Sequence, residues 1–359
     1  MPDLKTQIQQ RIMMNRDFNQ LLGTELPIIQ APMAGVQGSA LAIAVSEAGG
    51  LGSLPCGMLT TENIVSEIEL IKASTSKPFN LNFFCHEPKP YDEGRQAIWR
   101  DALQPYFDEL ELQIEHSVGG SRVPFSHDIA DAIEPFSPEF ISFHFGLPDK
   151  DLLQRVKSWG TKVVSSATTV EEAIWLESHG VDGIIAQGVE AGGHRGMFLS
   201  SDISTQMGLV SLVSQVVNRV KVPVIAAGGI SDRNAVLACM QLGASAVQVG
   251  TSYMLCTEAN TSDVHKRAIK SEKSSHTALT NIFSGKPARG IVNRVMAELG
   301  CMTELAPEFP YASIEMSQLR SCAEKQGLDD FSPLWCGQNT QGCNEISAKE
   351  LTLQLAGKY

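Results

Sequence analysis

A glycine-rich stretch around a single histidine is the part of this sequence best suited to chemistry. Residues 183–196 read Gly-Ile-Ile-Ala-Gln-Gly-Val-Glu-Ala-Gly-Gly-His-Arg-Gly. The apolar residues 184–186 predict a short buried strand, and the glycines that follow predict a loop whose backbone can approach a ligand closely. His194 follows Gly192 and Gly193, and a histidine can exchange a proton near neutral pH. The stretch indicates a ligand-binding loop with a candidate acid or base, although an ordinary turn with a surface histidine has the same pattern.

The elements around this loop alternate between short apolar strands and helices. Helix-like segments separate most of the strands, which favours a parallel sheet, and eight strands favour a closed (β/α)8 TIM barrel. An open, doubly wound α/β sheet is the alternative. The predicted strands are 27–34, 51–54, 77–84, 140–145, 162–166, 184–186, 222–229 and 245–251, and the predicted helices between them are 40–48, 61–73, 149–158, 170–179, 207–220 and 232–242.

Two segments interrupt or follow this alternation. Residues 85–138 contain eleven Asp or Glu against four Lys or Arg, a net charge of −7, and predict an acidic insertion with one helix at about 92–113. Such a charge bias is typical of a solvated face. Residues 257–359 predict helices joined by loops. We expect the barrel to comprise 21–84 and 139–256, and the other two segments to form a smaller, mainly helical subdomain over the barrel mouth as a lid on the substrate. Residues 1–20 predict a polar helix ahead of the barrel.

The composition excludes several classes of protein. A net charge of −12 argues against binding to nucleic acid or to an anionic membrane surface. No window of 18 uninterrupted apolar residues predicts a membrane span, and the first residues lack the apolar run of a signal peptide, so we expect a cytoplasmic protein. The eight cysteines include no C-x-x-C pair, which predicts reduced thiols and no structural metal site.

Polar residues gather where the predicted strands end, which in a parallel barrel is the face that carries active sites. Met33, Asn82, His144 and Gln187 each lie at or near the end of a strand. The last two strands end in Gly228-Gly229 and in Gly250-Thr251, and free backbone N–H groups in such loops can hold a phosphate. No G-x-G-x-x-G follows a strand, and there is no P-loop or H-E-x-x-H motif.

Five ordered motifs together resemble the nitronate monooxygenases. They are Gln-Ala-Pro-Met-Ala-Gly at 30–35, Val-Ser-Glu-Ala-Gly-Gly-Leu-Gly at 45–52, Ala-Gln-Gly-Val-Glu-Ala-Gly-Gly-His at 186–194, Ala-Ala-Gly-Gly-Ile at 226–230 and Gln-Val-Gly-Thr at 248–251. The resemblance implies an FMN-binding barrel. It implies that His194 is the catalytic base and that His144 lines the substrate pocket. The residues that it places against FMN are Met33, Asn82, Gln187, Gly192, Gly229, Gln248, Val249, Gly250 and Thr251.

The resemblance also implies an activity. The expected reaction is oxidation of alkyl nitronates, propionate 3-nitronate among them, by O2 to a carbonyl compound and nitrite, without reduced nicotinamide and with no metal. The expected partners are the nitronate and O2, and association into a homodimer is compatible with the resemblance. A flavin-dependent enoyl-acyl-carrier-protein reductase, which shares the Glu-Ala-Gly-Gly-His loop, is one alternative. A phosphate-binding barrel isomerase or lyase without redox chemistry is the other.

Overall fold

Eight parallel strands form a barrel in this computed structural model, which describes residues 18–116 and 122–358. The strands follow the order β1-β9-β8-β6-β5-β4-β3-β2, and a parallel bridge between Ile29 and Leu51 joins the two ends. The predicted (β/α)8 barrel is therefore confirmed, and the open sheet is excluded. The strands are β1 (Ile28–Gln30), β2 (Gly52–Pro55), β3 (Phe79–Phe84), β4 (Phe140–His144), β5 (Lys162–Ala167), β6 (Gly183–Gln187), β8 (Val224–Ala227) and β9 (Ala246–Val249).

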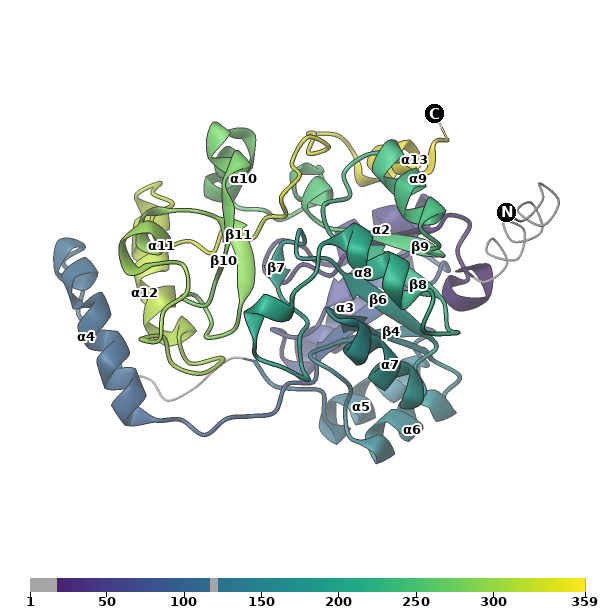
Figure 1. Ribbon diagram of the computed structural model, residues 1–359, viewed down its shortest axis with the longest axis horizontal. Helices are drawn as coiled ribbons and strands as arrows, with labels where there is room; N and C mark the ends of the chain where they lie inside the picture. Colours follow the sequence, from purple (N-terminus) through teal and green to yellow (C-terminus); the bar gives the residue numbers. More distant parts are fainter. Residues whose placement is uncertain (1–17, 117–121, 359) are drawn as a thin grey trace.

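Helices between these strands cover the outside of the barrel (Figure 1). Side-chain caps mark several of their starts: Thr60, Thr169 and Asp232 each accept a hydrogen bond from a backbone N–H three residues later. Such caps satisfy donors that would otherwise be unpaired at the first turn. The helices at the predicted positions are α2 (Ser39–Glu47), α3 (Thr61–Ser74), α6 (Lys150–Ser158), α7 (Val170–Ser178), α8 (Leu209–Val216) and α9 (Arg233–Gln241).

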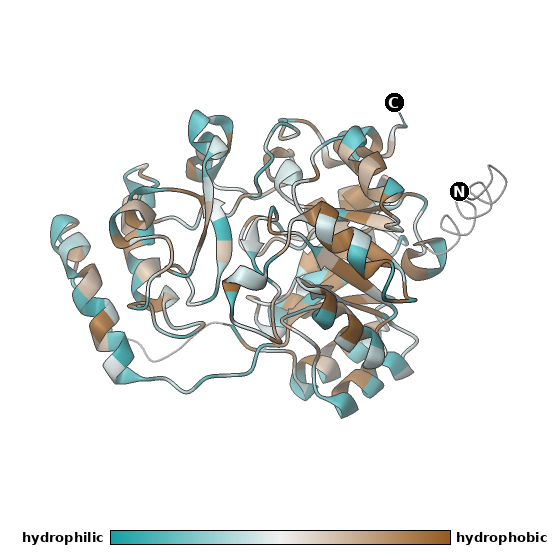
Figure 2. Ribbon diagram, in the orientation of Figure 1, coloured by the Kyte–Doolittle hydropathy of each residue, from teal (hydrophilic) through white to brown (hydrophobic). Residues whose placement is uncertain are grey.

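The strand residues alternate between two apolar layers, since neighbouring side chains on a strand point to opposite faces. Ile29, Val164 and Ile225 belong to the cluster inside the barrel, and Phe18 and Leu22 belong to the same cluster. The other face of each strand packs against the surrounding helices in the largest buried cluster. Figure 2 shows the apolar strands enclosed by helices with hydrophilic outer faces. The barrel is therefore filled at its centre, and space for a ligand remains at one end.

A second apolar cluster lies beside the barrel, at the left of Figure 1. In it, Trp99 and Phe107 of α4 (Glu93–Glu109) pack with Leu319 of α12 (Ser313–Lys325). This side also carries an antiparallel sheet in the order β10-β11-β7, made of β10 (Thr277–Thr280), β11 (Ala288–Ile291) and β7 (Gly193–His194). The sequence had predicted only helices and loops here. The remaining elements are α10 (Asp263–Lys270), α11 (Arg294–Leu299), η1 (Glu134–Phe136), η2 (Ile203–Thr205), η3 (Thr251–Leu255) and η4 (Glu272–Ser275).

Two helices from the predicted lid segments pack with the barrel layer instead. These are α5 (His127–Ile133), from the acidic insertion, and α13 (Ala348–Ala356), near the end of the chain. Their buried residues Ile133 and Leu351 belong to the same cluster as the barrel helices. The predicted domain boundaries remain a proposal, and within them we assign these two helices to the barrel. Of the helix predicted at 1–20, residues 1–17 lie outside the described residues, and 18–20 belong to a helical stretch that continues to residue 22.

Candidate functional site

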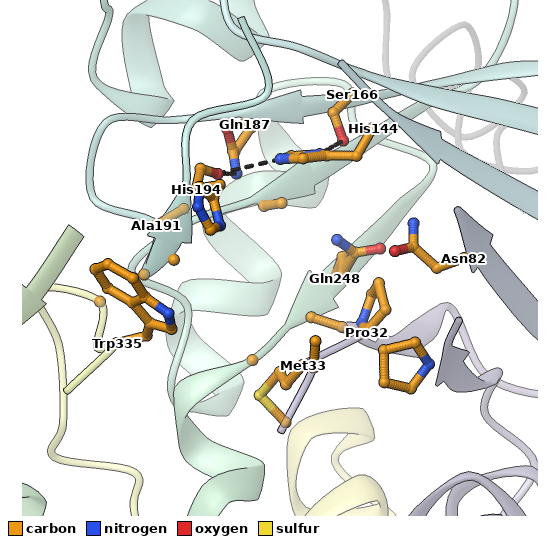
Figure 3. Close-up of a pocket in the computed structure, with 18 of the residues that line it drawn as sticks. Pro32, Met33, Asn82, His144, Ser166, Gln187, Ala191, His194, Gln248 and Trp335 are labelled. Atoms are coloured by element: carbon orange, nitrogen blue, oxygen red, sulfur yellow. Dashed lines mark hydrogen bonds between the residues drawn. The ribbon is translucent and has the colours of Figure 1, made fainter. Parts of the chain in front are cut away.

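A pocket opens at the carboxyl ends of the barrel strands, between the barrel and the second cluster. In Figure 3, Met33, Asn82, His194, Gln248 and Trp335 surround one open space. Nearly all of the predicted site residues line this pocket, although they come from elements far apart in the sequence. Those that do so are Met33, Asn82, His144, Gln187, Gly192, His194, Gly229, Gln248, Gly250 and Thr251.

Val249 is the exception among the predicted ligand contacts. It does not line the pocket, and its side chain is buried in the layer between the strands and the helices. The reason is the alternation along β9: Gln248 points into the pocket, so the next residue points outward. We therefore withdraw Val249 from the side chains that contact a ligand.

The two glycine loops after the last strands, Gly228-Gly229 and Gly250-Thr251, form a cradle of bare backbone in the pocket wall. Gly228 and Gly229 have φ angles of 127° and 68°, which L-residues rarely adopt. A Cβ atom on Gly229 would lie 3.2 Å from the Cβ atom of Glu190. Gly250 follows β9 and also lines the pocket. The backbone of these loops is thus open to a ligand, as a phosphate site requires.

The segment 335–339 contacts the same cradle. None of its residues was in the predicted site. The Gly337 N–H donates to the Thr251 hydroxyl at 3.0 Å, and the Asn339 amide donates to the Gly229 carbonyl at 3.2 Å. A Cβ atom on Gly192 would come within 2.6 Å of the Gly337 nitrogen, so glycine is required at position 192. Trp335, Gly337 and Asn339 all line the pocket. The run Trp-Cys-Gly at 335–337 was the available signal in the sequence.

Gln187 holds the histidine loop in place. Its Nε2 atom donates to the His194 carbonyl at 3.0 Å, and its Oε1 atom accepts from the Gly196 N–H at 2.8 Å. His144 supports the same loop, because its Nε2 atom lies 3.2 Å from the His194 carbonyl oxygen. A carbonyl only accepts, so this nitrogen carries the hydrogen, and the His144 Nδ1 accepts from the Ser166 hydroxyl at 3.0 Å. Burial lowers the pKa of His144 to about 4.

His194 sits in an aromatic enclosure. Its ring centroid lies 5.5 Å from that of Trp335, 5.7 Å from Phe309 and 6.0 Å from Phe145. Burial lowers the pKa of His194 well below its usual value, and the positive charge of Arg122 lowers it further. The imidazole is therefore neutral at neutral pH and can accept a proton.

Two cationic side chains lie over these aromatic rings, and neither belongs to the site residues predicted from the sequence. The Arg122 guanidinium carbon is 5.4 Å from the Phe309 centroid, and the Lys286 Nζ is 4.7 Å from the Phe145 centroid. Arg122 lines the pocket. The acidic insertion thus contributes a positive charge to the site.

Comparison with known proteins agrees with this architecture. The family model described as "Nitronate monooxygenase" matches residues 15–357. The chain belongs to the nitronate monooxygenase family. A protein named nitronate monooxygenase from Pseudomonas aeruginosa is 38% identical over 337 residues, which cover 93% of this chain and 96% of that protein. A second, from Paraburkholderia phytofirmans, is 38% identical over 341 residues, 93% of this chain and 92% of that protein.

Solved structures give the same result. A nitroalkane oxidase from Streptomyces ansochromogenes has a TM-score of 0.86 at 36% identity, covering 95% of this chain and 97% of that chain. FabK from Thermotoga maritima has a TM-score of 0.71 at 27% identity, with coverages of 95% and 94%. Nitronate monooxygenases are flavin-dependent oxidoreductases, so this chain is a flavin-dependent enzyme.

The pocket of this nitronate monooxygenase family member fits a flavin. Gln248 Oε1 is buried without a hydrogen-bond partner among residues 18–116 and 122–358, and such an acceptor calls for a donor from a ligand. The N–H edge of a flavin ring is a donor of that kind. The glycine cradle suits the phosphate end. No cluster of three metal-binding side chains occurs in the described part of the chain, and none of its helices is long and apolar enough to cross a membrane.

Proposed function

We propose that this enzyme binds FMN non-covalently and oxidises alkyl nitronates, propionate 3-nitronate among them, with O2 to a carbonyl compound and nitrite. One observation carries the proposal: a neutral, half-buried histidine lines the same pocket as two glycine loops whose backbone can bind a phosphate. The flavin, when bound, supplies the electron acceptor, so no external reductant is needed.

The chain's own residues divide the binding of FMN between them. The loops at Gly228-Gly229 and Gly250-Thr251, supported by Gly337, would hold the phosphate through backbone N–H groups. The Gln248 amide would accept from the polar edge of the ring, and Met33 would pack against the ring. The Asn82 amide lines the pocket beside Gln248 (Figure 3) and donates to the Ser142 carbonyl at 3.1 Å.

His194 would supply the proton chemistry. A neutral nitroalkane must lose a proton from carbon before it can be oxidised, and a neutral imidazole is the form that can take it. A nitronate has already lost that proton. The aromatic rings around His194 would exclude water from the reacting atoms. We assign the base role to His194 and a supporting role to His144, since both nitrogens of His144 already have partners.

Oxygen uptake by the purified holoenzyme tests this function. Propionate 3-nitronate and ethyl nitronate should consume O2 and release nitrite, and heat-denatured protein should release FMN into the supernatant. Rapid anaerobic bleaching of the flavin by NADH, without turnover of any nitronate, would instead support the enoyl reductase alternative. A flavin other than FMN in the supernatant, or flavin that stays with the precipitate, would contradict the proposed cofactor.

A further inference from the structure

The pocket contains one charged side chain, Arg122, that takes no part in the proposed binding of FMN or in the proton transfer. Arg122 is the only Arg, Lys, Asp or Glu among the described residues that line the pocket. It comes from the acidic insertion, residues 85–138, in which most of the other described charged side chains are exposed. A guanidinium that faces a ligand pocket rimmed by aromatic rings needs an explanation, because partly burying a cation costs free energy unless an anion offsets it.

The surroundings of Arg122 offer no such anion. Among residues 18–116 and 122–358, Arg122 forms no ion pair with a carboxylate. Its side chain donates one hydrogen bond there, from Nη1 to the Ser313 hydroxyl at 3.3 Å. Burial lowers the pKa of Arg122, and no neighbouring carboxylate among the described residues offsets this shift. The guanidinium carries five N–H donors. Most of them therefore remain available to a ligand.

Arg122 lies away from the phosphate cradle and near His194, the proposed catalytic base. Its guanidinium carbon is 5.4 Å from the Phe309 centroid, and the same ring lies 5.7 Å from the imidazole of His194. The cradle, by contrast, is built from the ends of β8 and β9 and from Gly337. The cation–π contact with Phe309 places the guanidinium on this side of the pocket, and its N–H groups other than the one bonded to Ser313 are available to an anion.

We propose that Arg122 recognises the negative charge of the substrate and so makes the enzyme prefer nitronates to neutral nitroalkanes. The inference rests on the proposed function. His194 cannot serve as that charge partner, since the neutral imidazole carries no positive charge. Lys286 stands over Phe145 and does not line the pocket, so it contributes to the positive potential without direct contact. Nitronate and nitroalkane differ chiefly in this charge, and Arg122 is placed to read it.

Steady-state kinetics of Arg122→Gln and Arg122→Lys test the proposal, with Arg219→Gln as the matched control. Arg219 is exposed just after α8 and does not line the pocket, so its variant removes the same charge elsewhere. In Arg122→Gln, KM for ethyl nitronate should rise about 10- to 100-fold, the range expected for a lost hydrogen bond to a charged group, with little change in kcat. KM for neutral nitroethane should change less than about twofold on the same reasoning. Arg122→Lys should recover part of the loss, and Arg219→Gln should match the wild type.

A binding measurement separates recognition from a structural role. Calorimetry of the resting holoenzyme with inorganic nitrite should show weaker binding in Arg122→Gln by about tenfold or more, and circular dichroism and flavin content should be unchanged. Equal losses for nitronate and nitroethane, or an unchanged KM for nitronate, would overturn the inference. So would a Lys286→Gln variant that loses nitronate affinity while Arg122→Gln keeps it. A wild-type enzyme that oxidises no nitronate would refute the proposed function itself.

Discussion

The Nε2 atom of His194 lies 2.8 Å from the Oγ atom of Ser284. The same oxygen lies 3.3 Å from the backbone carbonyl oxygen of Lys286, which can only accept a hydrogen bond. If the Ser284 hydroxyl donates to that carbonyl, it must accept from His194, so Nε2 carries the imidazole hydrogen. The other nitrogen, Nδ1, then holds the free lone pair. With this hydrogen-bond arrangement, Ser284 determines which nitrogen of His194 acts as the base.

Replacing His194 should affect the reaction of the neutral nitroalkane and leave that of the nitronate nearly unchanged. His194→Asn should lower kcat/KM for neutral nitroethane by about 100- to 10,000-fold, the usual contribution of a general base. Turnover of ethyl nitronate should stay near normal, because that substrate has no proton to lose and the neutral imidazole offers no charge. Oxygen uptake with each substrate measures both. Equal rates with wild type on both substrates would remove His194 from the chemistry.

Ser284→Ala tests the orientation of the imidazole. The variant should lower kcat for nitroethane by several-fold to tenfold, the size expected for one hydrogen bond, and leave the nitronate reaction unchanged. Ser284→Thr, which keeps the hydroxyl, should restore most of the rate. If Ser284→Ala slowed both substrates equally, Ser284 would act on the pocket as a whole and not on the proton-accepting nitrogen.

The barrel could be predicted because parallel strands buried on both faces are continuous apolar runs, such as Gly183–Gln187, separated by amphipathic helices. The small antiparallel sheet could not. β10 and β11, Thr277–Thr280 and Ala288–Ile291, have no clear alternation of apolar and polar residues, and β7 is only two residues long. Their pairing depends on where the barrel presents His194, which is information that a local pattern does not contain.

In the site, too, some residues could be predicted from the sequence and others could not. Residues in strand-end motifs, such as Asn82 and Gln248, reach the pocket because the barrel brings all strand ends to one face. Val249 was predicted to contact FMN because it lies inside the contiguous motif 248–251. Alternate side chains of a strand point to opposite faces, so Val249 points away from the pocket. Arg122 was missed because a count of charges treats an acidic stretch as one solvated face. Only the folded chain reveals that this one arginine faces inward.

The phosphate cradle can be tested with two matched glycine substitutions. Gly229→Asp places a negative charge and a side chain where the phosphate is expected, and flavin occupancy should fall by about 100-fold or more because like charges at close range repel strongly. Gly160→Asp is the control: its φ of 83° imposes similar backbone strain, but nothing lies within 4 Å of its Cβ position and it does not line the pocket. The visible absorbance of the flavin relative to the absorbance of the protein measures occupancy. Full occupancy in Gly229→Asp would mean that the phosphate binds elsewhere.

Acid should destabilise the fold through buried histidines, and His265 provides the cleanest case because it lies outside the pocket. Its Nε2 atom is 3.1 Å from the Trp335 carbonyl oxygen, and burial lowers its pKa from 6.5 to about 4. The folded protein therefore keeps His265 neutral between these values, while the unfolded chain takes up a proton. Stability contributed by this group is complete above pH 6.5 and is lost as the pH falls toward 4.

The size of the effect follows from the same shift. One pKa unit corresponds to about 1.4 kcal/mol, so His265 alone would cost up to about 3 kcal/mol of stability by pH 4. In His265→Gln, whose amide can still donate to the Trp335 carbonyl, the fall in melting temperature between pH 7 and pH 4 should be a few degrees smaller than in wild type. His276→Gln, at an exposed position nearby, should keep the wild-type slope. Differential scanning calorimetry of the holoenzyme between pH 7 and pH 4 measures this difference. Parallel slopes for wild type and His265→Gln would show that folding does not lower the pKa of His265.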